Sequence, residues 1–105
     1  MNILKLTYNE LTINGKNFYS VEIFLPKTTL LIVGNEFGYF MCGALDVNVF
    51  NLPHLKKRGV VCGRSMGVKT IDELLNSELE LVTDSAKELG INSGMKVSDA
   101  LLLLS

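Results

Sequence analysis

The stretch LTINGKNFYSVEIF, residues 11–24, carries the strongest fold signal in the sequence. Asn14-Gly15 separates two runs rich in β-branched and aromatic residues, and this dipeptide is a strong short-range signal of a β-hairpin. Both central residues of a type I′ turn need positive φ angles, which asparagine and glycine tolerate. We therefore predict a hairpin whose returning strand covers residues 18–24.

Further strands are expected on both sides of this hairpin. Residues 3–8 precede it as an apolar run, and Pro26 ends the returning strand because proline cannot donate a hydrogen bond to a sheet. Residues 28–33 form a third β-branched and apolar run, and residues 39–42 return after a glycine-containing turn. Residues 1–42 are thus expected to form a mostly antiparallel sheet.

Helical signals follow this region. A helix is expected after Asp46, with a break or a new helical start at Pro53 and a left-handed cap at Gly59. Residues 60–62 read as a short buried strand. Strand, helix and strand within 24 residues are compatible with a right-handed crossover between parallel strands.

The last third of the chain is expected to be helical. Thr70-Ile71-Asp72-Glu73 matches the capping box ahead of two leucines, and a final helical pair covers residues 85–89 and roughly 97–104. The fold class predicted for residues 1–105 is α+β in one domain. It is a two-layer sandwich, with a mostly antiparallel N-terminal sheet and the C-terminal helices packed mainly on one face.

Composition excludes several functional classes. Ten basic and eleven acidic residues give a net charge of −1, so the basic footprint of a nucleic-acid-binding protein is missing. Apolar residues make up 48% of the chain, which argues against a disordered segment, yet no apolar run reaches the ~20 residues of a membrane helix. The first residues do not match a signal peptide, and we expect two reduced cysteines and a cytoplasmic location. The spacing of the cysteines matches no zinc pattern, so no metal and no cofactor is expected.

Four groups of residues occur together in a recognisable order. They are Leu25-Pro26 with residues 30–33, GYFMCGALD at 38–46, GVKTIDELL at 67–75, and the small and apolar positions between residues 86 and 101. This order resembles the YunC-like family, a small bacterial and archaeal domain of unknown function. The resemblance spans about residues 11–104, with Cys42-Gly43-Ala44-Leu45-Asp46 as its most specific part. The sequence departs from the family pattern at residues 50–58, where Pro53 interrupts the expected helix.

The resemblance implies a small two-layer α/β fold and self-association, as a homotetramer, through the N-terminal strands. It implies no established activity. The sequence is consistent with assembly, because large apolar area left over after folding tends to find a partner subunit. The short N-terminal β region is rich in large apolar residues, among them Leu4, Leu6, Tyr8, Phe18 and Phe24.

Two similar strand ends, Met41-Cys42-Gly43 and Val61-Cys62-Gly63, carry the cysteines. If the two strands are parallel neighbours, the thiols are expected to lie close together at one sheet edge, where ligands of open α/β sheets bind. A helix N-terminus nearby would make Cys42 more nucleophilic. The alternative is that both cysteines are small buried hydrophobes.

Asp46 has two interpretations, a general base or hydrogen-bond acceptor beside Cys42, or a helix cap. In an enzyme of unknown reaction, Cys42 would be the nucleophile and Asp46 the base or orienting group. His54 stands alone on a basic stretch and is interpreted as a solvated helix residue.

The loop at residues 63–70, GRSMGVKT, is the candidate ligand-binding segment. Its glycine and lysine spacing differs from that of a P-loop, which excludes nucleotide hydrolysis of that type. Arg64, Ser65, Lys69 and Thr70 offer cations and hydroxyl groups for a small anion. The alternative for Arg64 is an ion pair with an acidic residue of this chain or of a neighbouring subunit.

Three hypotheses follow from these residues. The first is a homo-oligomeric binding or accessory protein that holds a small anionic metabolite near Arg64. The second is an enzyme that uses Cys42 on an acidic substrate. The third is a purely structural interaction module, which needs no site.

Overall fold

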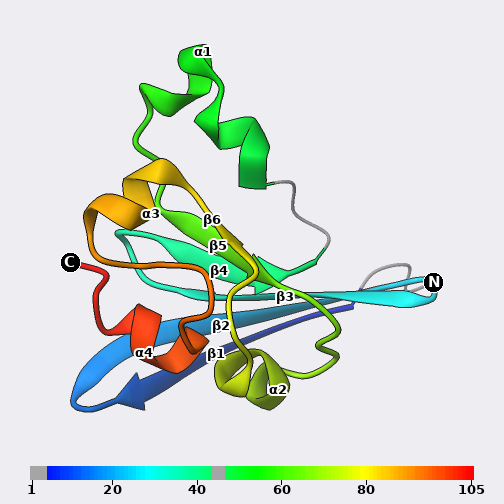
Figure 1. The fold of residues 1–105 in the computed structure, drawn as a ribbon. Coiled ribbons are helices and arrows are strands. Elements are labelled where there is room, and N and C mark those ends of the chain that lie inside the picture. Colours follow the sequence, from blue (N-terminus) through cyan, green and yellow to red (C-terminus); the bar gives the residue numbers. More distant parts are fainter. Residues whose placement is uncertain (1–4, 44–46) are drawn as a thin grey trace.

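The fold is built on one sheet of six strands (Figure 1). A computed structural model describes residues 5–43 and 47–105 of the chain. The strands follow one another across the sheet in chain order: β1 (Lys5–Ile13), β2 (Lys16–Leu25), β3 (Thr28–Gly34), β4 (Tyr39–Cys42), β5 (Cys62–Ser65) and β6 (Leu81–Val82). All neighbouring strands are antiparallel except β4 and β5, which are parallel. The mostly antiparallel sheet and the parallel pair are as predicted.

Local turn signals positioned the two N-terminal hairpins correctly. Asn14 and Gly15 have φ angles of 49° and 78°, and Ile13 pairs with Lys16 across the turn. Strand β1 is continuous over nine residues, whereas the sequence indicated two shorter runs. The second hairpin turns at Pro26 and Lys27, between the paired residues Leu25 and Thr28.

The helical elements are short. They are η1, a 3₁₀ helix (Val47–Asn51), and the α-helices α1 (Pro53–Lys56), α2 (Ile71–Asn76), α3 (Asp84–Glu88) and α4 (Val97–Leu101). Proline at the first helical position explains why a new helix starts at Pro53. Thr70 caps α2 as predicted, and Thr83 caps α3 in the same way. Gly59 and Gly90 have positive φ angles just beyond the ends of α1 and α3.

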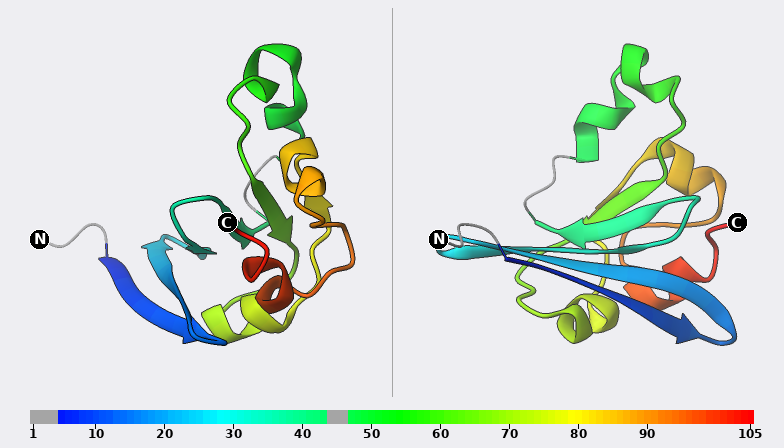
Figure 2. Two further views of the ribbon diagram at one scale, coloured as in Figure 1. Left: turned by 90° about the vertical axis from the view of Figure 1, so that its left-hand side faces the viewer. Right: turned by 180° about the vertical axis from the view of Figure 1, so that it is seen from behind.

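The helices α2, α3 and α4 cover one face of the sheet, which we call the inner face. The core lies between the two layers and is formed by the buried residues Phe18, Leu31, Val33, Phe40, Leu74, Leu79, Ile91, Val97 and Leu101, among others. Figure 2 shows α2 and α4 packed together beside the sheet, while η1 and α1 project from its other end. The predicted α+β fold with helices mainly on one face is therefore confirmed.

Two details at β5 differ from the prediction. The strand expected to end at Cys62 begins there and runs to Ser65, and β6 was not predicted. A Cβ atom at Gly63 would lie 2.9 Å from the carbonyl oxygen of Leu81 and 3.0 Å from Cγ1 of Val82. Gly63 therefore lets β6 approach closely within the sheet, and it does not mark a strand end.

Candidate functional site

The two cysteines do not meet at one sheet edge, so that expectation was wrong. β4 and β5 are parallel neighbours, but Cys42 aligns with Ser65 while Cys62 aligns with Tyr39. The offset of three residues also places the thiols on opposite faces of the sheet, since successive side chains of a strand alternate. Cys42 faces the core and Cys62 faces away from it.

Among the residues that the structure describes, neither thiol has the surroundings of an activated nucleophile. Cys42 is 6% exposed, and its Sγ lies 3.8 Å from the carbonyl oxygen of Thr29. Cys62 is fully buried, and burial raises its pKa to about 11, an effect that a hydrogen bond with Tyr39 only partly offsets. Asp46, the proposed base, lies outside the described residues, so its two interpretations stay predictions.

Arg64 forms the ion pair that was the alternative to anion binding. Its Nε and Nη2 donate hydrogen bonds of 3.0 and 2.8 Å to Oε1 of Glu80. The pair connects β5 with the segment just before β6, where the backbone N–H of Glu80 also donates to the carbonyl oxygen of Arg64. Arg64 is thus held on the face of the sheet away from α2 and α4.

The three other predicted ligand-binding residues have structural partners. Ser65 is buried, with its Oγ 2.6 Å from Oγ of Ser77 and donating to the carbonyl oxygen of Glu78 at 2.8 Å. Thr70 accepts a hydrogen bond from the backbone N–H of Glu73 at its Oγ1. Because Arg64 and Ser65 point to opposite faces of β5, the four residues do not converge on one point.

Among the predicted site residues that the structure describes, Lys69 lines a cleft. Its backbone N–H donates to Oε1 of Glu73 at 2.8 Å, while its side chain is exposed. The cleft has a volume of about 490 Å³ and is open to solvent. We call it the lysine cleft and define it by the residues that line it: Phe24, Leu25, Lys27, Thr28, Thr29, Val68 and Lys69.

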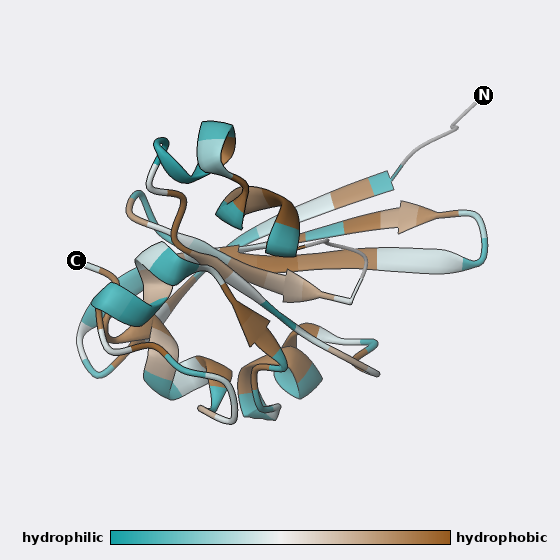
Figure 3. Cartoon of the chain, turned by 45° about the horizontal axis from the view of Figure 1, so that its top comes forward, coloured by the Kyte–Doolittle hydropathy of each residue, from teal (hydrophilic) through white to brown (hydrophobic). Residues whose placement is uncertain are grey.

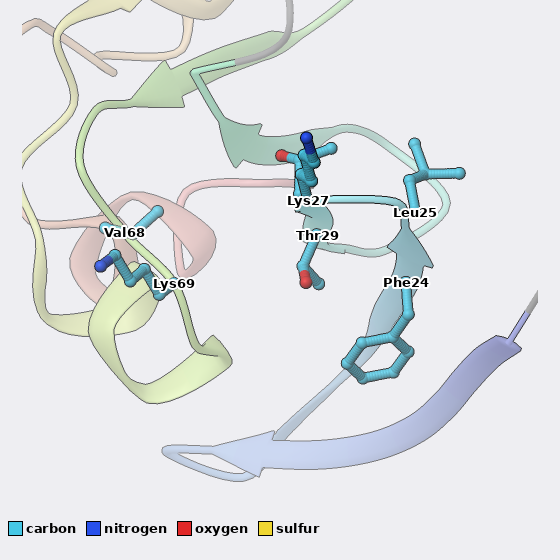
Figure 4. Close-up of a pocket in the computed structure, with 7 residues that line it drawn as sticks. Phe24, Leu25, Lys27, Thr29, Val68 and Lys69 are labelled. Carbon is cyan, nitrogen blue, oxygen red and sulfur yellow. The ribbon is translucent and has the colours of Figure 1, made fainter.

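The lysine cleft joins two distant parts of the sequence (Figure 4). One wall is the β2–β3 hairpin and the other is the loop between β5 and α2. Sequence patterns did not indicate residues 24–29 as part of a site, since no motif connects them with residues 68 and 69. The one local signal was Pro26-Lys27, which marks a turn and gives no indication of what faces it.

The second candidate surface is the sheet face opposite the core, which we call the outer face. The strand register places Tyr8, Val21, Ile32 and Met41 in one row across β1 to β4, with Leu6 and Ile23 in the next row of this face. Leu6 and Tyr8 are 56% and 58% exposed, and the other four are half-buried. None of the six belongs to the core cluster or packs against it.

Two tyrosine side chains stack on the outer face. The rings of Tyr8 and Tyr19 are stacked with centroids 6.4 Å apart. Near β5 and β6, by contrast, the chain itself covers the outer face. There η1 contacts both strands, and Val47 and Cys62 are fully buried. Figure 3 shows hydrophobic segments on the strands that extend beyond the helices. The outer face is thus covered by the chain's own residues at one end and open at the other.

The five apolar residues expected to drive assembly divide among different environments. Leu6 and Tyr8 lie on the outer face, Phe24 lines the lysine cleft, and Phe18 is buried in the core. Leu4 lies outside the described residues. The burial of Phe18 under the helical layer removes it from any surface that could pair with another subunit.

Residues 5–43 and 47–105 contain no group of three or more His, Cys, Asp or Glu side chains placed to hold a metal ion. Within these ranges, no helix combines the length and apolar character needed to cross a membrane.

The fold and its surfaces define a class of small α+β proteins with a six-stranded sheet covered by helices on one face. Residues 41–104 match the family described as "Domain of unknown function (DUF1805)", and the chain belongs to this family. It is 52% identical over 90 residues to "Uncharacterized protein YunC" of Bacillus subtilis, covering 86% of this chain and 88% of the relative. The resemblance to the YunC-like family is thereby confirmed.

A solved structure shares the fold. The crystal structure of TA1206, a protein of unknown function from Thermoplasma acidophilum, superposes with a TM-score of 0.86 and 28% sequence identity. The match covers 100% of this chain and 98% of that one. The names of these relatives state no activity.

Proposed function

We propose that this chain is a self-associating cytoplasmic protein that serves as a binding or accessory subunit for a small organic anion. One observation carries the self-association, namely the open outer face of β1 to β4. Exposed apolar patches rimmed by polar residues are typical of protein interaction sites. A second copy of the chain fits this face, because closed homo-oligomers pair identical patches around a twofold axis.

The tetramer implied by the family resemblance is the assembly we expect. Two copies that pair through their outer faces would bury Tyr8, Val21 and Ile32 and extend their aromatic contacts across the interface. Strand β1 is also an edge strand, and it leaves backbone hydrogen-bonding groups for a further contact. Two such contacts per subunit are enough to build a tetramer with twofold symmetry.

The test is the mass of the protein in solution, measured by light scattering during gel filtration. Tyr8→Glu places a charge on the outer face and is expected to shift the protein to a smaller species. Asn9→Glu is the matched control, because it adds the same charge to the next residue of β1, on the opposite face, where Asn9 is exposed. A monomeric wild-type protein, or equal effects of the two substitutions, would contradict the proposal.

Anion binding has separate support from the lysine cleft. Lys27 and Lys69 bring two positive charges to a concave site of the size that small molecules use, roughly 300–1,000 Å³. The enzyme alternative has weaker support, since Cys42 is buried and directed at a backbone carbonyl oxygen. A purely structural module would share the assembly but would need no cleft, so ligand binding distinguishes the two.

A further inference from the structure

We propose that the lysine cleft binds a small organic anion, either a phosphate monoester or a carboxylate, that also carries an apolar group. This inference rests on the proposed function and gives its anion a site and a chemical class. It moves the site from Arg64, which is paired with Glu80, to the space between the β2–β3 hairpin and the loop before α2.

Both walls of the cleft are held in place before any ligand arrives. On one wall Phe24 pairs with Thr29 and Leu25 with Thr28 in the hairpin. On the other wall Val68 packs against the core. The neighbouring backbone N–H of Lys69 is bonded to the carboxylate of Glu73. A preformed site loses little conformational freedom on binding, and this favours affinity.

The two lysines of the cleft form no ion pair among the described residues, although the carboxylate of Glu73 lies nearby on the backbone N–H of Lys69. In the ranges that the structure describes, the ion pairs are Lys56–Asp84, Lys87–Asp84 and Arg64–Glu80, and neither Lys27 nor Lys69 takes part in one. The two lysines come from opposite walls (Figure 4). A third cation lies close, because Nζ of Lys5 is 5.5 Å from the ring centroid of Phe24. This concentration of charge stands out in a chain whose net charge is −1.

Lys27 occupies a backbone conformation that other residues adopt more easily. Its φ angle is 64°, and it follows Pro26 in a tight turn, a position that favours glycine or asparagine. Strained residues of this kind cluster at ligand sites, where they hold a side chain in place. Here the strained residue is one of the two cations that line the cleft.

The remaining residues that line the cleft favour a ligand with an apolar group beside its anionic group. Phe24 is 37% exposed and Val68 is half-buried, so each offers apolar surface to a ligand. The hydroxyl group of Thr29, which pairs with Phe24 across the hairpin, can donate to phosphate or carboxylate oxygens. An anion with an attached ring or alkyl group satisfies both parts of the site, whereas a bare anion or a neutral apolar molecule satisfies only one.

Isothermal titration calorimetry with four probes tests this class. Phenyl phosphate and phenylacetate carry both parts, inorganic phosphate carries only the charge, and phenol carries only the ring. We expect binding of at least one of the first two, with inorganic phosphate and phenol each at least about tenfold weaker. Equal affinity for phenyl phosphate and inorganic phosphate would overturn the apolar part of the proposal.

Substitutions then locate the site. Lys27→Gln and Lys69→Gln are each expected to raise the Kd by about tenfold, since each removes one charge-assisted hydrogen bond. Lys57→Gln is the matched control, because it removes the same charge from an exposed position at the end of α1, outside the cleft. Equal effects of all three substitutions would show general charge attraction and overturn the site.

Lys27→Gly separates binding from folding. Glycine relieves the strain at the positive φ angle, so the variant is expected to melt at a higher temperature while it binds the probe more weakly. A variant with a higher Tm and unchanged affinity would show that Lys27 does not contact the ligand, and this would overturn its role.

The same samples distinguish this inference from the proposed function. If the wild-type protein assembles but binds none of the probes, the cleft proposal fails and self-association stands. If the protein binds an anion whose affinity is unchanged in both lysine variants, anion binding stands and its location in the cleft is wrong. If a monomer binds phenyl phosphate through Lys27 and Lys69, the cleft stands and self-association fails.

Discussion

Two neighbouring residues of β3 show how differently the two faces of the sheet are covered. Leu31 points to the inner face and is fully buried under the helical layer. Ile32 points to the outer face, is half-buried, and is not packed against the core. Both side chains are large and aliphatic, so the sequence pattern treats them alike. The difference shows that, in the part of the chain that the structure describes, the helical layer covers only one face of the middle strands, although these strands are apolar on both faces.

The largest difference in the free energy of unfolding is expected between alanine substitutions of these two residues. Leu31→Ala is expected to lower the free energy of unfolding by about 3 kcal/mol at any protein concentration, because it leaves a cavity in the core. Ile32→Ala should cost only about 1 kcal/mol in the monomer, because part of the side chain is already in water.

Urea unfolding over a range of protein concentrations measures both effects. Assembly through the outer face would make the cost of Ile32→Ala grow with protein concentration, while that of Leu31→Ala stays constant. If the cost of Ile32→Ala is independent of concentration, the outer face is not buried between subunits.

The second contrast concerns the part of the outer face that the chain does cover. Cys62 lies there, and burial raises its pKa to about 11, above the ordinary value of 9.0. Burial and the neighbouring Cys62 also raise the pKa of Tyr39 to about 12. Between pH 9 and 11 the unfolded chain loses the Cys62 proton while the folded chain keeps it, so the stability that is complete below pH 9 decreases as the pH rises.

The expected loss from Cys62 is about 2 kcal/mol by pH 11, measured by chemical denaturation at successive pH values. Cys62→Val should reduce this alkaline loss, because it removes the titrating thiol. Equal alkaline profiles for the wild-type protein and Cys62→Val would show that Cys62 does not keep its proton in the folded state.

The cysteines also show what the sequence could and could not predict. Asn14-Gly15, Pro53 and Thr70 act through their own backbone or the next turn, so the hairpin, the helical start and the cap followed from local chemistry. The strand ends at Cys42 and Cys62 look alike locally, but their places depend on the register between β4 and β5. That register is a long-range feature, and so is the pairing of β5 with β6, whose close approach the missing side chain of Gly63 allows.

Prediction of the candidate site from the sequence was limited in the same way, to local features. Lys69 was found because it lies in a glycine-containing loop, a local feature. Its partner Lys27 lies 42 positions earlier in the sequence, on a hairpin whose position opposite the loop follows only from the folded sheet. The ion pair of Arg64 was among the alternatives considered, but its partner Glu80 became identifiable only once β5 and β6 were paired.

The smallest effect is expected from that ion pair on the outer face. The side chains of Arg64 and Glu80 are 22% and 44% exposed, and pairs this accessible to water contribute at most about 1 kcal/mol. A double-mutant cycle with Arg64→Met and Glu80→Gln should therefore give a coupling energy below about 1 kcal/mol, and the coupling should decrease further in high salt. A coupling that is larger and insensitive to salt would mean that another layer shields this end of the outer face from solvent. A second subunit packed on the open face would supply such a layer, and the interface would then extend to β5.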